Sequence, residues 1–506
     1  MQTASDENMP KPFLTKRVET PETWRRDGEA AIERAKNYKN FNKHAKNVIL
    51  FIGDGMGIST ITASRILEGQ TRGTSGEENW LSFEKFPSVA LSKTYSVNQQ
   101  TSDSAPTMSA IISGIKTDET IISVNQNVVV GDYRTVKGNE TKTLLEMAEQ
   151  NGKSTGVVTT ARLTHATPAA CYAHSAHRDW EADSNLSADA RQAGFPDIAR
   201  QLIEFPYGDG LEVAIGGGRT KFLPKAANDP EYTDRTGERL DGRNLTVEWQ
   251  KKYQNSAYVW NRQQFDAVDA KKTKHLLGLF EPSHLQYNYD RLKDKAGEPS
   301  LSEMTSKAID VLSQNKKGFF LMVEAGRIDH AHHNGNAFRA LTDTIELSNA
   351  VQTAENKVNL KDTLIIVTAD HSHTFTIGGY PIRGNNILGL VREVDSKGML
   401  EEKPKTDEND KPFTTLGYAN GKGYRGGERP QLTEEQVTSP DYKQEAAVPL
   451  TDETHGGEDV AIFANGAGSH LVRGVMEENW IFYVMRDAMR LKQSTVVSHQ
   501  STKIDN

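Results

Sequence analysis

Short apolar runs alternate with segments of helical periodicity along most of this 506-residue chain. The runs are too short for buried helices and end at glycine or polar residues, which is typical of strands buried on both faces. We therefore predict an α/β fold, a three-layer α/β/α sandwich around a large central, mostly parallel sheet. The predicted strands are residues 47–52, 154–159, 211–215, 319–323, 364–367 and 460–463, and the predicted helices are residues 58–67, 143–150, 195–203, 301–313 and 337–355.

Three of the predicted strands are followed by an acidic residue. Asp54 comes after strand 47–52, Glu324 after strand 319–323, and Asp370 after strand 364–367. Ligands of parallel sheets bind beyond the carboxyl ends of the strands. Aspartate is common after strands in general, but three acids at one edge, two of them near histidines, indicate a metal site.

The stretch from residue 318 to 333 is the strongest single candidate. Asp329 and His333 lie four residues apart, which on a helix places a carboxylate and an imidazole on one face. The alternative is a solvated, polar helix start after a core strand. Two other segments decide between these interpretations by offering further ligands. His371 and His373 follow a strand, although one of them could be structural, and His455, at a Gly-rich turn, would supply a missing third ligand.

Ser104 and Arg178 are candidates for catalysis. Ser104 precedes an apolar helical run, so its oxygen would lie near a helix N-terminus, where a bound phosphate is favoured. It could instead merely cap the helix, but next to a metal cluster a serine hydroxyl is a competent nucleophile. Arg178 could clamp a phosphate or be an ordinary surface arginine. His165 and Thr167 follow strand 154–159 at the same edge of the sheet.

Composition and charge narrow the functional classes. A net charge of −8 gives no electrostatic footprint for specific nucleic-acid binding. The sequence contains no run of 18 apolar residues, so we predict no membrane-spanning helix. No signal peptide is visible at the N-terminus, although a processed chain would look the same. The single cysteine, Cys171, permits no internal disulfide, and we expect it to be buried rather than nucleophilic.

The chain divides into four parts by composition. Residues 1–40 form an N-terminal arm and a predicted helix, and residues 41–375 and 453–495 form the core. Residues 376–452 are rich in glycine and charge and interrupt that core as an insertion, and residues 496–506 are a polar tail. The GDGMG sequence after the first strand is not a dinucleotide fingerprint, because Ile58 stands where the third glycine would be.

Six motifs then resemble, in order, those of alkaline phosphatases, and the resemblance covers about residues 12–490. The motifs are GDGMG, DSA, HATP followed by Arg178, VEAGRIDHAHH, TADHSH and THGGEDVAIFA. The animal-type branch is most similar, and a bacterial source stays open. The resemblance implies hydrolysis of phosphate monoesters at alkaline pH through a phosphoseryl intermediate on Ser104, with Arg178 holding the phosphate and inorganic phosphate as product inhibitor.

The resemblance also implies two Zn²⁺ and one Mg²⁺. One zinc would take Asp329, His333 and His455, and the other Asp54, Asp370 and His371. The Mg²⁺ would take Asp54, Thr167 and Glu324, with Asp103, His165 and His330 supporting the site. A further Ca²⁺ or Mg²⁺ site would use Glu231, Phe280, Glu281 and Glu298.

Residues 376–452 match the insertion called the crown, at the interface of an implied homodimer, and a periplasmic or secreted location is expected. His332 is left without a role.

Three alternative functions carry less weight. Sulfatases share the fold by resemblance, but Met108 stands where their signature has arginine, and their oxygen-ligated calcium would not need three histidines. The others are a phosphodiesterase and a non-catalytic metal-binding protein.

Overall fold

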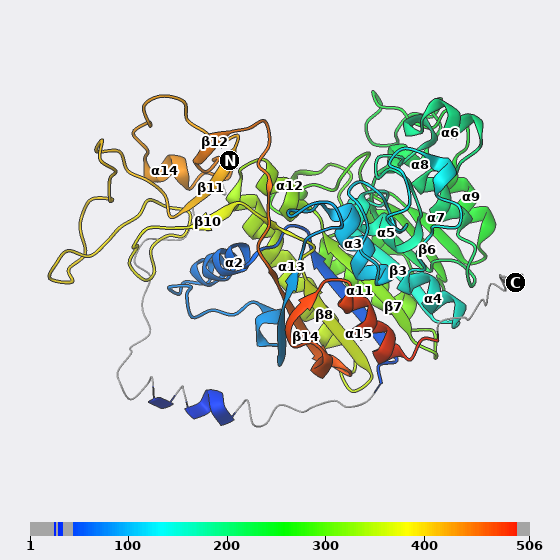
Figure 1. Ribbon diagram of the computed structural model, residues 1–506, viewed down its shortest axis with the longest axis horizontal. Helices are drawn as coiled ribbons and strands as arrows, with labels where there is room; N and C mark the ends of the chain where they lie inside the picture. Colours follow the sequence, from blue (N-terminus) through cyan, green and yellow to red (C-terminus); the bar gives the residue numbers. More distant parts are fainter. Residues whose placement is uncertain (1–24, 27–28, 34–43, 493–506) are drawn as a thin grey trace, which may run out of the picture.

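The structure is a computed structural model that describes residues 25–26, 29–33 and 44–492 (Figure 1). Residues 25–26 and 29–33 are helical. The rest of the predicted N-terminal arm and helix, and the polar tail from residue 496, lie outside the described residues. Among the described residues, no helix is both long and apolar enough to cross a membrane.

A ten-stranded sheet forms the centre of the molecule. All neighbouring strands run parallel except at β14, which is antiparallel to both β2 and β8. The prediction of an α/β fold with a large, mostly parallel sheet is confirmed. In spatial order the strands are β15 (Gly474–Glu477), β2 (Ser88–Lys93), β14 (Val460–Gly466), β8 (Thr363–Thr368), β1 (Asn47–Gly53), β7 (Phe319–Ala325), β3 (Ser154–Arg162), β4 (Val213–Gly217), β6 (His275–Leu279) and β5 (Ser256–Val259).

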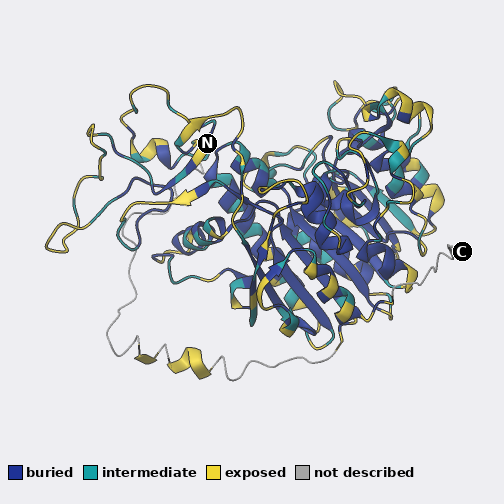
Figure 2. Cartoon of the chain, in the orientation of Figure 1, coloured by how far each residue is buried: buried dark blue, intermediate teal, exposed yellow. Residues whose placement is uncertain are grey.

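Helices cover both faces of this sheet, and the apolar residues of its strands divide between two cores. Val48, Leu50 and Ile52 of β1 point into one core, and Ile49 and Phe51 point into the other. This alternation explains why the central strands are continuously apolar. Figure 2 shows the buried residues concentrated along the sheet. The first core includes residues of α3 (Ser104–Ser113), α4 (Leu144–Gln150), α5 (Ala166–Tyr172), α7 (Ile198–Glu204), α9 (Leu245–Lys252) and α15 (Trp480–Met489), and the second includes residues of α10 (Arg262–Ala267), α11 (Leu301–Leu312), α12 (Arg327–His333) and α13 (Ala337–Lys357).

Every predicted strand lies in this sheet, whereas β2, β5, β6 and β15 were not predicted. The predicted helices are present with shifted ends: α2 (Ile58–Thr71) is longer than predicted, and α7 begins at Ile198 because Asp197 caps it. Short helices α6 (Ala188–Gln192) and α8 (Arg219–Phe222) lie in the connections.

The predicted insertion contains a small sheet of its own. Strands β10 (Phe375–Ile377), β11 (Leu416–Gly421) and β12 (Ala446–Pro449) pair beside α14 (Glu434–Val437), and they appear at the left of Figure 1. Leu416 and Tyr418 of β11 pack against Leu67 of α2 and Leu341 of α13. A short antiparallel pair, β9 (Ser372–His373) and β13 (His455–Gly456), joins the segment that enters the insertion to the segment that leaves it.

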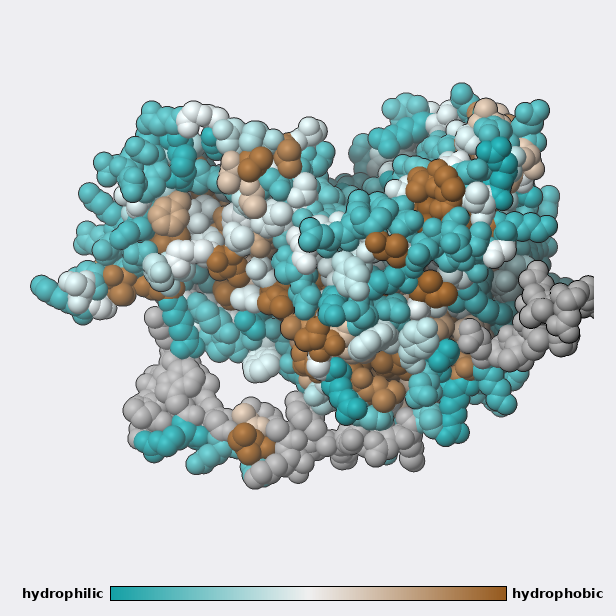
Figure 3. Space-filling view, viewed as in Figure 1, coloured by the Kyte–Doolittle hydropathy of each residue, from teal (hydrophilic) through white to brown (hydrophobic). Residues whose placement is uncertain are grey.

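The face of the molecule in Figure 3 is mostly hydrophilic, with separate small hydrophobic patches. A different polar feature lies inside, near the amino ends of β3 and β4. Glu149 and Glu212 are both buried, and both are held by Thr155, whose hydroxyl donates to Glu149 Oε1 (2.6 Å) and whose amide donates to Glu212 Oε2 (2.6 Å). Burial and the charge of Glu212 raise the pKa of Glu149 to about 9, and burial raises the pKa of Glu212 to about 8.

This pair should destabilise the protein as the solution becomes alkaline. Both carboxyl groups have a folded-state pKa above their unfolded value, so the unfolded chain loses protons first as the pH rises from about 4.5 to about 9. Glu149→Gln keeps an acceptor for Thr155 but cannot ionise. We expect its melting temperature, relative to the parent, to rise between about pH 5 and about pH 9.

The matched control is Glu435→Gln, which removes an exposed carboxylate from α14. Its melting temperature should follow that of the parent at every pH. A difference between Glu149→Gln and the parent that stays constant over the whole pH range would contradict the account.

Candidate metal centre and active site

The sheet brings three acidic residues together at the carboxyl ends of its central strands. β1 lies between β7 and β8 and runs parallel to both. Asp54 follows β1, Glu324 is the next-to-last residue of β7, and Asp370 follows β8 with one residue between. All three side chains are completely buried.

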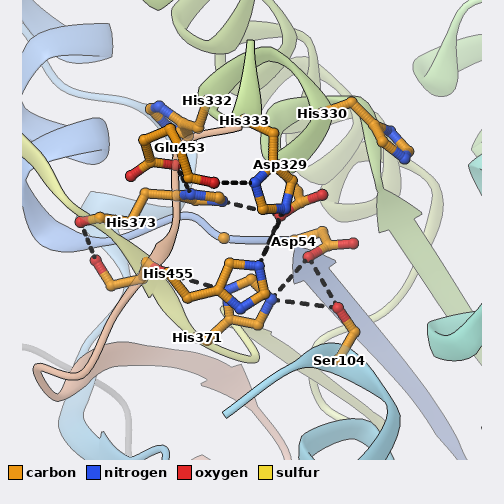
Figure 4. Close-up of polar contacts among 12 residues, drawn as sticks. Asp54, Ser104, Asp329, His330, His332, His333, His371, His373, Glu453 and His455 are labelled. Carbon is orange, nitrogen blue, oxygen red and sulfur yellow. Dashed lines mark hydrogen bonds and ion pairs between the residues drawn. The ribbon is translucent and has the colours of Figure 1, made fainter. Parts of the chain in front are cut away.

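A first cluster consists of Asp54, Asp370 and His371 around the hydroxyl of Ser104 (Figure 4). Ser104 Oγ lies 3.3 Å from Asp54 Oδ1 and 3.2 Å from His371 Nε2. His371 Nε2 is in turn 3.3 Å from Asp54 Oδ1 and 3.5 Å from Asp370 Oδ2. Asp370 Oδ1 accepts the amides of Gly55 and His371, which fixes the carboxylate.

Asp103, and not Ser104, caps helix α3. The Asp103 carboxylate accepts a hydrogen bond from the amide of Ser104 (2.6 Å), which is the first residue of the helix. The hydroxyl of Ser104 therefore faces the first cluster instead of the backbone. Of the two interpretations that the sequence left open, the geometry favours the one in which this oxygen takes part in chemistry.

A second cluster surrounds Asp329, on the short helix α12. Asp329 Oδ1 lies 3.2 Å from His333 Nε2, 2.9 Å from His373 Nε2 and 3.4 Å from His455 Nε2. The carbonyl oxygens of Glu453 and Ser102 contact the Nδ1 atoms of His333 (2.5 Å) and His455 (2.8 Å). These contacts turn both Nε2 atoms toward Asp329, the arrangement that metal-binding histidines usually show.

His373 belongs to the same cluster but is held differently. Its Nδ1 contacts the carboxylate of Glu453 (2.6 Å) while its Nε2 contacts Asp329. His371 faces the first cluster and His373 the second, so the two histidines of this run serve different carboxylates. The contact of His373 with Asp329 was not predicted, because β-strand alternation cannot tell which of two nearby acids a histidine will reach.

A third cluster contains oxygen atoms without a hydrogen-bond partner among the described residues. Asp54, Glu324 and His165 each have a possible metal-ligating atom, and these atoms lie within 4.8 Å of one another. In the described part of the chain, Asp54 Oδ2, Glu324 Oε1 and the hydroxyl of Thr167 are buried without a hydrogen bond, as is Asp370 Oδ2 in the first cluster. Buried oxygen atoms without a partner are costly unless a cation lies among them.

The electrostatics of the described side chains lead to the same conclusion. Burial, followed by repulsion from Asp370, raises the pKa of Asp54 well above its usual range and that of Glu324 to about 7. The donors fit specific ions: imidazole with carboxylate suits Zn²⁺ in the first two clusters, and the oxygen atoms of Asp54, Thr167 and Glu324 in the third suit Mg²⁺.

A guanidinium group lies beside these clusters. Arg178 Nη1 pairs with Asp103 Oδ2, and Arg178 Nη2 is 3.1 Å from His165 Nε2. Although burial raises it, the pKa of Asp103 is held well below its usual range by Arg178. Both residues line a cavity of about 770 Å³, together with Ser104, Asp329, His333 and His455. The cavity therefore combines a serine hydroxyl, two histidines of the second cluster and a guanidinium group.

Comparison with known proteins assigns the chain to a family. The family model for alkaline phosphatase matches residues 45–491. This chain belongs to the alkaline phosphatase family. The tissue-nonspecific alkaline phosphatase of Gallus gallus is 45% identical over 483 residues, covering 94% of this chain and 90% of that protein. An alkaline phosphatase of Gadus morhua is 44% identical over 483 residues, covering 94% of this chain and 98% of that protein.

Solved structures agree on the fold. The alkaline phosphatase of the Antarctic bacterium TAB5 matches with a TM-score of 0.60 and 22% identity, over 89% of this chain and all of that one (100%). The alkaline phosphatase of Thermus thermophilus matches with a TM-score of 0.63 and 22% identity, over 91% of this chain and 94% of that one. The family resemblance seen in the sequence is confirmed, and the enzyme class is that of a phosphomonoester hydrolase.

In this alkaline phosphatase, two histidines of α12 lie outside the three clusters. His330 points away from Asp329 (Figure 4) and packs against His284, with ring centroids 4.0 Å apart. His332, which had no predicted role, is completely buried. Its Nε2 contacts the hydroxyl of Thr60 in α2 (3.0 Å), and its Nδ1 contacts the hydroxyl of Tyr418 in β11 (2.8 Å). His332 thus connects the helix that carries Asp329 to the insertion.

The fourth cation site stays a prediction, and the structure places one further acidic residue beside two of its carboxylates. Glu231 and Glu281 lie within ligand distance of Asp294, which was not predicted because it lies in a loop without periodicity. Arg219 Nη2 is 3.0 Å from Glu231 and offsets part of the charge. Glu298 is buried nearby, and its carboxylate accepts a hydrogen bond from the backbone amide of Gln286 (3.0 Å). Phe280 follows β6 and packs in the second core. Burial and then Glu281 raise the pKa of Glu298 to about 9.

Proposed function

We propose that this alkaline phosphatase hydrolyses phosphate monoesters at alkaline pH through a phosphoseryl intermediate on Ser104. The observation that carries the proposal is the position of the Ser104 hydroxyl. It faces Asp54 (3.3 Å) and His371 (3.2 Å) at the start of a helix, in the same cavity as Arg178. A helix N-terminus and a guanidinium both favour the negative oxygens of a phosphoryl group.

The reaction divides into two displacements. Ser104 Oγ loses its proton and forms a bond to phosphorus as the bond to the ester oxygen breaks, and the leaving alcohol takes up a proton. Water then attacks the phosphoserine and releases inorganic phosphate, which restores the Ser104 hydroxyl. Arg178 binds the phosphoryl oxygens in both steps and is held in place by Asp103. Because phosphate occupies the same contacts, we expect it to inhibit as a product.

The metal ions fit the three clusters described above. We propose that Asp329, His333 and His455 hold one Zn²⁺, that Asp54, Asp370 and His371 hold the other, and that Asp54, Thr167 and Glu324 hold Mg²⁺. When bound, such ions stabilise negative charge on attacking and leaving oxygens. A variant of the TAB5 enzyme has been described with Mg bound in a site called M3, which supports a magnesium site in the family.

Ser104→Ala should remove the nucleophile and leave the metal-binding residues intact. We expect turnover of p-nitrophenyl phosphate to fall by at least about 10³-fold. Zinc and magnesium contents should stay those of the parent. Acid quenching of the parent during turnover should trap phosphate on the peptide that contains Ser104, as detected by mass spectrometry.

Ser113→Ala is the matched control, because Ser113 ends the same helix, and its hydroxyl donates to the carbonyl of Ser109 (2.7 Å) and accepts from the backbone amide of Ile115 (3.4 Å) instead of contacting the three clusters. It should keep nearly full activity and show the trapped phosphate. Parent-like activity of Ser104→Ala with normal metal content would disprove the phosphoserine.

Metal removal should abolish activity reversibly. After exhaustive treatment with EDTA and verified loss of metal, we expect no turnover, and Zn²⁺ with Mg²⁺ should restore it. Because Glu324 belongs only to the proposed magnesium set, Glu324→Gln should lower the magnesium content and keep about two zinc ions per chain. Elemental analysis of the purified proteins measures both. Full activity without metal, or equal loss of both metals in Glu324→Gln, would contradict the assignment.

We also propose that the protein is a homodimer whose interface includes the insertion. Large hydrophobic side chains are exposed there, among them Tyr380 (87%), Met399 (66%) and Val448 (51%). Exposed apolar groups in one region are typical of interfaces. Light scattering should give the mass of two chains for the parent and a shift toward one chain for Tyr380→Ser. A single-chain mass for the parent would rule the dimer out.

A further inference from the structure

The carboxylate of Glu119 lies in the cavity and has no part in the three clusters or in the proposed phosphate binding. Glu119 lines the cavity together with Gln99, Thr101 and Arg178. The side-chain amide nitrogen of Gln99 points toward this wall and donates to Glu119 Oε2 (2.6 Å) and to the carbonyl of Thr101 (3.3 Å). Glu119 is thus held at the cavity wall by an uncharged partner.

The backbone around Glu119 fixes this position. The amide of Glu119 donates to Asn98 Oδ1 (3.0 Å), and the amide of Arg178 donates to the carbonyl of Thr120 (2.7 Å). Thr120 itself has a φ of 78°, in the left-handed region that a β-branched residue rarely adopts. The loop that carries Glu119 is therefore tied directly to the segment that carries Arg178.

The charges that line this cavity are unevenly distributed. Arg178 is its single guanidinium or ammonium group among the described lining residues, and Asp103 pairs with it. Asp452, at the wall near His455, is paired with Lys422 (2.6 Å). Among the described residues, Glu119 forms no ion pair of its own, although the charge of Arg178 acts on it. Bound metal ions would place their positive charge at the three clusters, so Glu119 is a separate negative charge at the cavity wall, where it acts on the part of a substrate outside the phosphoryl group.

We propose that Glu119 sets the charge preference of the site for the leaving group. Phosphate monoesters whose leaving group carries a protonated amine would be favoured over those whose leaving group carries a second anion. The inference rests on the proposed phosphomonoesterase function and concerns which esters that function uses. Burial and then Asp103 raise the pKa of Glu119 to about 7, so its carboxylate is ionised at alkaline pH.

Three esters of matched length test the inference: the phosphate monoesters of ethanolamine, ethylene glycol and glycolate. Their leaving groups are cationic, neutral and anionic at about pH 8.5, where a primary amine is protonated. The parent should show a higher kcat/KM for the amine than for the carboxylate. Glu119→Gln should reduce that ratio by about three- to tenfold, because one unit charge leaves the cavity.

Asp118→Asn is the matched control, since it removes the same charge from the adjacent residue of the same loop without lining the cavity. It should leave the ratio of the parent unchanged. An unchanged ratio in Glu119→Gln, or an equal change in Asp118→Asn, would overturn the inference. Absence of turnover for all three esters would instead contradict the proposed function, so the two failures are distinguishable.

Discussion

Several carboxylates of like charge are buried at one edge of the sheet, and the rest of the structure must accommodate their repulsion. Asp54, Glu324 and Asp370 have no exposed surface, and Asp329 has almost none. An unpaired buried carboxylate costs several kcal/mol, and the raised pKa values of Asp54 and Glu324 reflect that cost. Among these four carboxylates, Asp329 is the one whose negative charge is largely offset by the described histidines. Cations among the remaining oxygens are the physical solution that the donor atoms fit.

The parallel topology is what makes this concentration of charge possible. Three adjacent strands, β8, β1 and β7, end at the same edge, so residues far apart in sequence meet there without any change in strand direction. The helices that follow the strands add the remaining groups: α3 begins with Ser104, and α12 carries Asp329 and His333. The sheet thus holds the Ser104 hydroxyl and the clustered carboxylates and imidazoles within hydrogen-bond distances of one another, which is the positioning that the proposed displacement at phosphorus would need.

How far the sequence predicts this site follows from the same geometry. Asp54, Glu324 and Asp370 could be predicted because their positions need only strand order and direction. The strand β2 was missed because its residues alternate between buried and exposed instead of forming an apolar run. Glu119 and Asp294 lie in loops, and the path of a loop cannot be predicted from a periodic pattern of apolar residues. The roles of His332 and His373 depend on contacts with Tyr418 and Glu453, which are distant in sequence.

Those last contacts bear on what the insertion does. The chain leaves the core after His373, forms the insertion, and returns through Glu453 to His455. Glu453 binds His373 through its carboxylate and His333 through its carbonyl, and Tyr418 of the insertion binds His332. The segments that enter and leave the insertion are therefore the ones that orient the second cluster. Because the insertion is anchored in this way, we expect substitutions that loosen it to shift the imidazoles of His332, His333 and His373 around Asp329.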